Sequence, residues 1–141
     1  MSEIKRFQVG ERMSQAAVHG DTVYTAGQVA QSAPGASVAD QTRAILSQID
    51  DLLREAGTDK SRLISATIWL SDVSTFNEMN KIWDAWVVQG QTPCRACVES
   101  KLAAPQFNGE ISVIAALLSQ KKQRRMRILN IGEGVFGVSS A

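Results

Sequence analysis

The chain has 141 residues, of which 44% are hydrophobic and 21% charged, and its formal net charge at pH 7 is +1. Its length is that of one ordinary domain and its composition is close to the globular average, which excludes disordered, collagen-like and coiled-coil chains. No apolar run approaches the roughly 20 residues of a membrane span, and residues 1–6 (MSEIKR) lack the apolar segment of a secretory signal. We therefore expect a cytoplasmic protein, not bound to membranes, whose two cysteines are reduced.

The first third of the chain is predicted to form β-strands. Short segments of mixed polarity cover residues 4–9 and 13–19, and a Gly-Asp turn separates them from the β-branched and aromatic residues 22–25 (TVYT). Residues 31–36, which include a Pro-Gly pair, are predicted to form a loop.

Residues 38–56 are predicted to form an amphipathic helix. Ser37, with Asp40 three residues later, is typical of a helix N-cap, and Gly57 is typical of a helix C-terminus. Apolar residues recur at helical spacing and define the buried face: Val38, Ile45, Leu46, Ile49, Leu52, Leu53 and Ala56.

Three further strands are predicted at residues 63–70 (LISATIWL), 94–100 and 110–118. In the first of these, alternation places four apolar residues on one face: Ile64, Ala66, Ile68 and Leu70.

A second amphipathic helix is predicted at residues 75–89. Thr75 and Glu78 have the spacing of a capping box, and Gly90 ends the segment. Its buried stripe is predicted to contain Phe76, Met79, Ile82, Trp83, Trp86 and Val87.

This order of elements predicts an α+β domain over residues 1–118, in which a mixed sheet carries two amphipathic helices on one face. Residues 119–141 would then form an atypical tail. A helix layer on one side leaves the opposite face of the sheet in need of cover, which favours an oligomer.

Cys94 and Cys97 form a C-x-x-C pair, a spacing typical of redox and zinc sites. Here the pair lies in a predicted strand, where positions i and i+3 point to opposite faces, so the thiols are poorly placed to form a disulfide or to share a metal. A tetrahedral zinc site also needs more ligands than these cysteines and the single histidine, His19, provide. We expect no metal site, and we expect His19 to be an exposed residue at a loop edge.

Arg95 and Glu110 are the strongest candidates for function by residue type. Alternation places Arg95, Cys97 and Glu99 on one face of their strand, opposite an apolar face that a helix would cover. A guanidinium suits bidentate binding of a substrate carboxylate. Glu110, at the start of what we expect to be the neighbouring strand, could position a water or transfer a proton. Spacing alone leaves open the alternative of a solvent-facing ion pair.

Four segments together resemble the RidA/YjgF family of reactive-intermediate, or enamine/imine, deaminases: residues 20–28 (GDTVYTAGQ), 64–90, 92–99 (TPCRACVE) and 109–116 (GEISVIAA). The most specific part is T-P-x-R-x-x-V followed by Glu-Ile fifteen residues after the arginine. Residues 67–90 look closest to the YoaB-like branch. The resemblance spans about residues 12–118.

The resemblance implies a chorismate-mutase-like domain assembled as a homotrimer, with active sites in clefts between subunits. It also implies hydrolysis of 2-aminoacrylate and related enamines or imines to 2-oxo acids and ammonium, with no metal or organic cofactor. By position, Arg95 would clamp the substrate carboxylate and Glu110 would orient the attacking water. The backbone at Cys97 would help to hold the substrate, and Gly27 would allow close approach of the backbone to the ligand.

Two positions depart from the best-known deaminases of the family. Met13 stands where those proteins carry a tyrosine, and Ala26 stands where they carry a serine. The resemblance therefore implies a cleft that lacks two potential hydroxyl donors. The resulting apolar pocket would favour bulkier imino acids or slow the chemistry. The alternative function is a non-catalytic module of the same fold that binds a small carboxylate at Arg95 for regulation or chaperoning.

The positive charge is concentrated beyond the predicted domain. Residues 121–127 contain five of the fifteen basic side chains, whereas residues 1–120 hold ten basic and thirteen acidic residues, a net charge of −3. We expect the basic run to be a solvated linker, because no aromatic residue is interleaved with it. Nucleic-acid binding, and the ribonuclease or translation-inhibitor activity ascribed to some relatives, is the less favoured interpretation.

The last part of the tail carries a second signal. Residues 132–137 (GEGVFG) match the dinucleotide-binding pattern G-x-G-x-x-G, but the chain stops four residues later, before the helix that this pattern needs. Residues 126–141 resemble the start of an FAD-dependent D-amino-acid dehydrogenase. Read-through or a frameshift into a neighbouring gene would account for such a segment.

Overall fold

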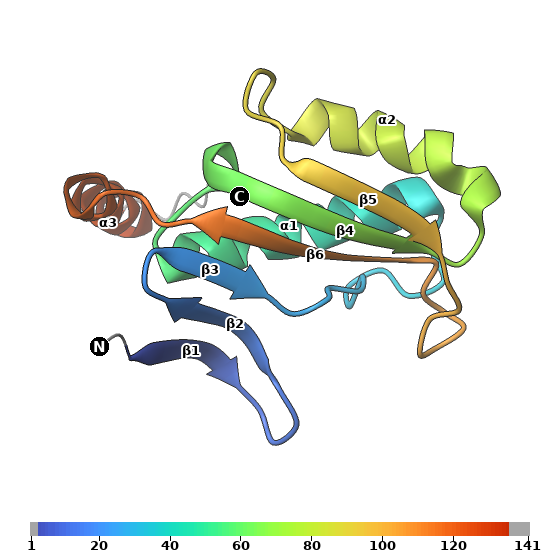
Figure 1. The fold of residues 1–141 in the computed structure, drawn as a ribbon, viewed down its shortest axis with the longest axis horizontal. Coiled ribbons are helices and arrows are strands. Elements are labelled where there is room, and N and C mark those ends of the chain that lie inside the picture. Colours follow the sequence, from blue (N-terminus) through green and yellow to red (C-terminus); the bar gives the residue numbers. More distant parts are fainter. Residues whose placement is uncertain (1–2, 136–141) are drawn as a thin grey trace.

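The computed structural model describes residues 3–135, which form one six-stranded mixed sheet and three α-helices (Figure 1). The spatial order of the strands is β1-β2-β3-β6-β4-β5, and only the β4–β5 pair is parallel. In chain order the elements are β1 (Ile4–Val9), β2 (Ser14–His19), β3 (Thr22–Thr25), α1 (Val38–Ala56), β4 (Leu63–Leu70), α2 (Phe76–Trp86), β5 (Cys94–Glu99), β6 (Gly109–Ala116) and α3 (Gln120–Val135).

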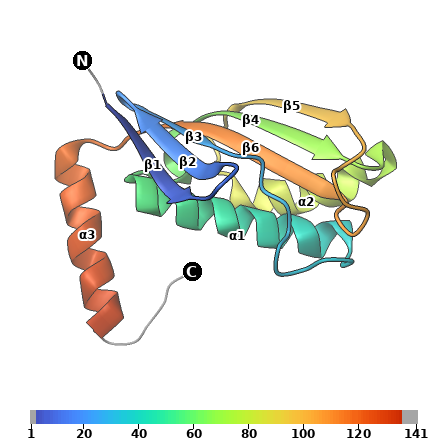
Figure 2. The same ribbon diagram turned by 90° about the horizontal axis from the view of Figure 1, so that it is seen from below.

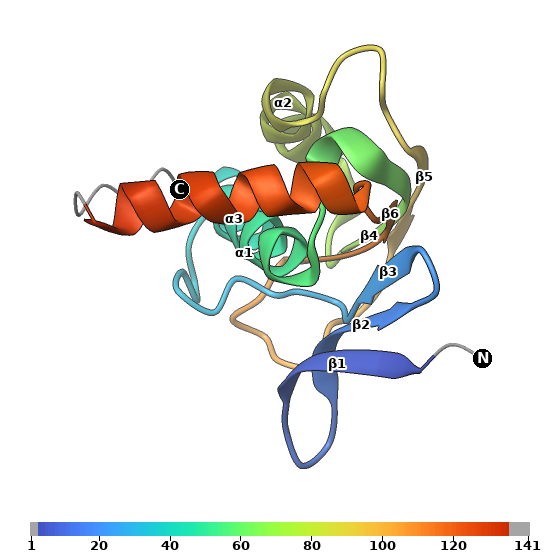
Figure 3. The same ribbon diagram turned by 90° about the vertical axis from the view of Figure 1, so that its left-hand side faces the viewer.

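Helices α1 and α2 lie on the same face of the sheet, as Figure 2 shows. The whole predicted stripe of α1 is buried in the core, together with the inward residues of β4 and β6. The predicted α+β architecture, with a mixed sheet and two helices on one face, is therefore confirmed. The hairpin of β1 and β2 extends beyond the helix layer (Figure 3), and Phe7 is the one buried residue of β1.

The ends of α1 are those that the sequence predicts. The Ser37 hydroxyl accepts a hydrogen bond from the Asp40 backbone N–H at 3.1 Å. Gly57 adopts a φ of 100°, in the left-handed region that suits glycine, and its N–H donates to the carbonyls of Arg54 and Leu53.

The predicted capping box of α2 is wrong. Thr75 makes no side-chain capping bond, and Glu78 instead accepts a hydrogen bond at 2.9 Å from the Ala39 N–H at the start of α1. A short 3₁₀ turn, Val73–Thr75, capped by Asp72, precedes α2 and orders that end. The glutamate therefore links the two helices. Helix α2 also ends at Trp86, because Val87 is already extended.

The predicted faces of β5 are reversed. In the parallel register, Arg95 lies opposite Ala66 and Cys97 lies opposite Ile68, and both β4 residues are buried beneath the helices. Arg95 and Cys97 therefore lie on the helix-covered face, whereas Val98, 47% exposed, lies on the open face. The apolar residues of this edge strand are small or exposed, so alternation alone could not decide which face is covered. On β4, a register shift between Leu63 and Ser65 similarly leaves Ile64 exposed.

The basic run belongs to helix α3, whereas its composition predicts a solvated linker. The Ser119 hydroxyl accepts from the Lys122 N–H at the start of α3, and the Gln123 side chain donates to the Leu118 carbonyl at 2.8 Å. The basic residues 121, 122, 124 and 125 are exposed.

The last two residues of the G-x-G-x-x-G match lie outside the described residues. Within residues 3–135, no helix combines the length and the apolar character needed to cross a membrane.

Candidate functional site

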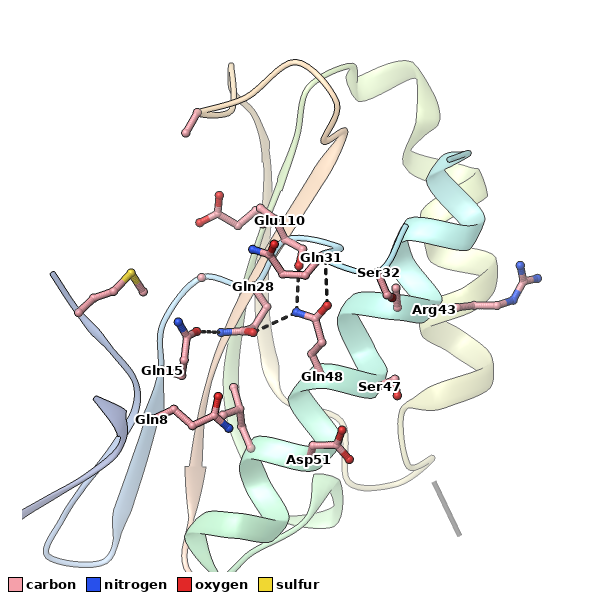
Figure 4. A pocket seen from close by; sticks show the side chains of 16 residues that line it. Gln8, Gln15, Gln28, Gln31, Ser32, Arg43, Ser47, Gln48, Asp51 and Glu110 are labelled. Atoms are coloured by element: carbon pink, nitrogen blue, oxygen red, sulfur yellow. Dashed lines mark hydrogen bonds between the residues drawn. The ribbon is translucent and has the colours of Figure 1, made fainter. Parts of the chain in front are cut away.

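A cavity of about 1020 Å³ lies beside the N-terminal strands, the segment after β3 and helix α1 (Figure 4). Three residues of the predicted site line it: Met13, Gly27 and Glu110. Arg95, Cys97 and Ala26 do not. The structure therefore divides the predicted residues between two places.

Glu110 and Gly27 fit together sterically. Residue 110 is paired with Trp69 of β4, so its side chain lies on the sheet face away from the helices. A Cβ on Gly27 would overlap the Glu110 carboxylate, lying 2.9 Å from Cδ. Two backbone hydrogen bonds between Gln28 and Ile111, of 2.8 and 3.1 Å, hold the two segments in this position. The absence of a side chain at Gly27 thus leaves the space that the Glu110 carboxylate occupies.

Three glutamines, Gln15, Gln28 and Gln48, are linked by side-chain hydrogen bonds and form the wall of the cavity next to Glu110 (Figure 4). The Gln28 amide nitrogen donates to the Gln15 side-chain oxygen at 2.9 Å, and the Gln48 amide nitrogen donates to the Gln28 oxygen at 3.1 Å. Gln48 also donates to the Val29 carbonyl at 2.9 Å and accepts from the Gln31 N–H at 3.1 Å. Because amides are neutral, this network fixes the wall without adding charge. No sequence pattern marks these glutamines as a group.

Met13 and Ala26, the two positions at which the resemblance implies lost hydroxyl groups, differ in their surroundings. The Met13 side chain is 46% exposed and lines the cavity. Ala26 contributes its backbone: its N–H donates to the Gln15 carbonyl at 2.9 Å, and its carbonyl accepts from the Gln28 amide at 3.2 Å.

Arg95 is held by three residues of α2. Its Nη1 donates to the Asn80 side-chain oxygen at 2.7 Å. Its guanidinium carbon lies 5.7 Å from the ring centroid of Phe76 and 5.4 Å from that of Trp83, within cation–π range. Among the described residues, the ion pairs are Arg43–Asp40 and Arg54–Asp51. The alternative of an Arg95–Glu110 ion pair within one chain is therefore wrong: Arg95 has a neutral partner, Asn80, and no carboxylate partner within residues 3–135.

Arg95 and Glu110 do not meet within one chain. Strand β4 lies between β5 and β6, so the expectation that their strands are neighbours is wrong. The two side chains also lie on opposite faces of the sheet, since Arg95 is paired with buried Ala66 and Glu110 with Trp69. A site that uses both residues therefore needs more than one copy of the chain.

The two cysteines and the histidine do not gather at one site in the part of the chain that the structure describes. Cys97 is half-buried and packs against the core, and burial raises the pKa of its thiol, an effect that the nearby Arg95 opposes. Cys94 is exposed on the other face of β5, which confirms that the two thiols diverge. His19 is exposed at the end of β2, as predicted. Among residues 3–135, no three His, Cys, Asp or Glu side chains gather as metal ligands.

Known proteins match most of the chain. The model of the family described as Endoribonuclease L-PSP matches residues 3–117. A RutC family protein named YoaB from Escherichia coli is 40% identical over 114 residues, which cover 81% of this chain and 98% of that protein. The 2-iminobutanoate/2-iminopropanoate deaminase of Rattus norvegicus is 30% identical over 108 residues, or 72% of this chain and 77% of that one.

The fold is also found among solved structures. The crystal structure of a YjgF-family protein from Neisseria meningitidis superposes with a TM-score of 0.80 at 39% identity, covering 83% of this chain and 97% of the other.

Proposed function

The chain belongs to the endoribonuclease L-PSP (RidA/YjgF) family, and we propose that it hydrolyses small 2-imino acids and their enamine tautomers, such as 2-aminoacrylate, to 2-oxo acids and ammonium. The rat relative, whose name gives 2-iminobutanoate and 2-iminopropanoate as substrates, supports this substrate class.

The surroundings of Arg95 are the main support for this proposal. Two aromatic rings and one amide fix its guanidinium, and within residues 3–135 it forms no ion pair. A fixed cation whose other N–H groups can still donate is suited to a ligand carboxylate, which it would bind through paired charge-assisted hydrogen bonds.

The proposed reaction needs few groups. Arg95 holds the carboxylate of the iminium substrate, and Glu110 accepts a proton from a water as that water attacks the imine carbon. The C–O bond forms to give a carbinolamine, whose nitrogen takes up the proton held by Glu110. The C–N bond then breaks as the carbinolamine hydroxyl becomes the carbonyl, and the hydroxyl proton converts the departing ammonia to ammonium. An iminium ion and one water thus give a 2-oxo acid and one ammonium ion. The backbone at Cys97 would contact the substrate, and no metal or organic cofactor takes part.

We propose that the site forms between subunits of a chorismate-mutase-like homotrimer. The separation of Arg95 and Glu110 within one chain supports this, because the two groups must act on one substrate. In this arrangement Arg95 comes from one subunit, and Glu110, with Gly27 and Met13, comes from the next. Light scattering should give about three times the monomer mass. A monomer at working concentrations would refute the shared site.

The direct test uses imines generated in the assay by an L-amino-acid oxidase and trapped by semicarbazide. A deaminase consumes the imine first, so wild type should lower the semicarbazone signal. Arg95→Ala should lose this effect, with a loss of about a hundredfold or more in kcat/KM. Arg6→Ala, which removes an exposed arginine from β1, is the matched control and should behave as wild type. An unchanged signal with every amino acid tested would reject the deaminase.

A carboxylate-binding module without catalysis is the second candidate, favoured by Met13 and Ala26, which supply no hydroxyl group to the site. It predicts binding of a 2-oxo acid that Arg95→Ala abolishes, with no imine hydrolysis. RNA cleavage, in contrast, should follow the basic residues of α3 and disappear when residues 121–141 are deleted.

A further inference from the structure

A second cavity, of about 560 Å³, lies between α1 and α2, and its lining includes none of the residues placed in the proposed active site. Its volume is within the usual range for small-molecule sites. Leu46 of α1 and Ile82 and Trp86 of α2 form its apolar wall. Figure 2 shows the two helices side by side beneath the sheet.

The Trp86 ring is fixed in this cavity. Its Nε1–H donates to Asp50 Oδ2 at 3.0 Å, and its ring centroid lies 5.4 Å from that of the buried Trp83, at an interplanar angle of 50°. Because the indole N–H already has a partner, what Trp86 offers a ligand is its apolar ring, which lies within cation–π range of Lys60. A fixed aromatic wall of this kind suits a flat apolar group.

Cations surround the apolar wall. The Lys60 ammonium lies 5.3 Å from the centroid of the Trp86 ring, and Lys81 and Arg43 also line the cavity. Of these three, Arg43 pairs with Asp40, which lies outside the lining, and the two lysines form no ion pair among residues 3–135. Three cations and one carboxylate, Asp50, leave the lining with a net positive charge.

The net positive charge of the lining favours an anionic ligand, and Asp50 does not cancel this preference. Its carboxylate is directed at the Trp86 N–H. Burial raises the pKa of Asp50, and the hydrogen bond from Trp86 and the charge of Lys60 only partly oppose this effect. The acidic group thus serves to hold the indole, while the lysines remain for a ligand.

We propose that the α1–α2 cavity is a second ligand site, which binds a small aromatic carboxylate with its ring against Trp86 and its carboxylate between Lys60 and Lys81. This site is separate from the proposed deaminase site, because its lining contains neither Arg95 nor Glu110. Trp83 lies between the two sites, within 5.4 Å of both the Arg95 guanidinium and the Trp86 ring.

The test is an NMR titration of the ¹⁵N-labelled full chain with 2-naphthoate, monitored at the Trp86 indole N–H, which the Trp86→Phe variant assigns. The neutral isostere 2-naphthamide is the control ligand. We expect 2-naphthoate to shift this resonance at millimolar concentrations or below and to bind about tenfold more tightly than the amide, because one charge-assisted contact contributes about that factor.

Two sets of variants locate the binding. Lys60→Gln combined with Lys81→Gln should weaken 2-naphthoate about tenfold, whereas the matched pair Lys121→Gln and Lys122→Gln on α3 should not. Arg95→Ala removes a cation from Trp83, the neighbour of Trp86, and so can move the starting resonance, but it should leave the dissociation constant of 2-naphthoate unchanged. Equal binding of the amide, no effect of the Lys60 and Lys81 changes, no shift at all, or loss of binding in Arg95→Ala would each overturn the proposal. The last outcome would place the anion at Arg95.

Discussion

The carboxylate of Glu110 occupies the space in which a side chain at position 27 would begin, so that the glycine and the acid form one steric unit. The family resemblance implies that both residues belong to the site, but it implies a different role for the glycine, the close approach of backbone to ligand. In the structure, the group that approaches Gly27 is the side chain that we propose to position the water.

Gly27→Ala should therefore displace Glu110 while leaving the fold intact. A displacement of about 1 Å at a catalytic group can cost about a hundredfold in rate, and we expect a fall in kcat of that order. Imine hydrolysis by the variant, alongside its thermal unfolding, measures the effect. The overlap should also lower the midpoint of thermal unfolding of Gly27→Ala. Glu110→Asp in the same chain shortens the acidic side chain, relieves the overlap and should return that midpoint toward the wild-type value. Wild-type activity and stability in Gly27→Ala would show that Glu110 has room to move.

Substitutions at Asn80 test whether Arg95 needs a neutral partner in order to bind substrate. Asn80→Asp places a carboxylate at the position that now accepts from Arg95 Nη1 at 2.7 Å. That carboxylate would compete with the substrate for the guanidinium, so KM should rise about tenfold, and by more than in Asn80→Ala. Added salt should weaken the new ion pair and partly restore substrate binding. Equal KM values in the two variants would mean that Arg95 does not bind the substrate carboxylate.

A substitution at Gln28 tests whether the amide network stabilises the fold. Gln28 is 6% exposed, and its side chain bonds Gln15, the Ala26 carbonyl and Gln48. Gln28→Leu keeps the approximate volume but leaves buried polar groups without partners, so it should lower the free energy of unfolding by about 2–3 kcal/mol. Urea denaturation measures this change. Gln31→Ala, which removes an exposed side chain and keeps the backbone bond to Gln48, should be near neutral. Equal losses in both variants would contradict a special role for the network.

The fold was predictable where a periodic apolar pattern coincides with complete burial. The seven-residue stripe of α1 is the clearest case, because each of those positions packs into the core. The two faces of β5 were not predictable, because an edge strand with small and charged residues presents no distinct apolar side. Contacts between distant polar residues, such as Glu78 with Ala39 or Gln28 with Gln48, also leave no local pattern. Residue type and family resemblance indicated Arg95 and Glu110, but only the strand order separates them.

Asp50 should make stability depend on pH. Its pKa is raised in the folded state, chiefly by burial. Below the ordinary value of 3.8 Asp50 is protonated in both states, so its stabilising contribution is fully present and does not change with pH. As the pH rises, the unfolded state ionises first, and stability falls until the folded-state pKa is passed. Asp50→Asn retains an acceptor for Trp86 but cannot ionise. Its stability relative to wild type should therefore increase from acidic to neutral pH in urea denaturation. A difference that does not change with pH would exclude this linkage.

The shared site predicts complementation between two inactive chains. If Arg95 and Glu110 act in the same site from different subunits, a trimer that contains both Arg95→Ala and Glu110→Gln chains holds some sites in which neither change is present. With equal amounts and random assembly, half of the arginines and half of the glutamates are intact, so about one quarter of the sites should be functional. Co-expression with two different tags, purification through both, and the imine assay measure this fraction. Because double-tag purification enriches mixed trimers, the recovered activity should be at least this high. Activity no greater than that of either variant alone would place both residues in a single-chain site, which the order of β6, β4 and β5 opposes.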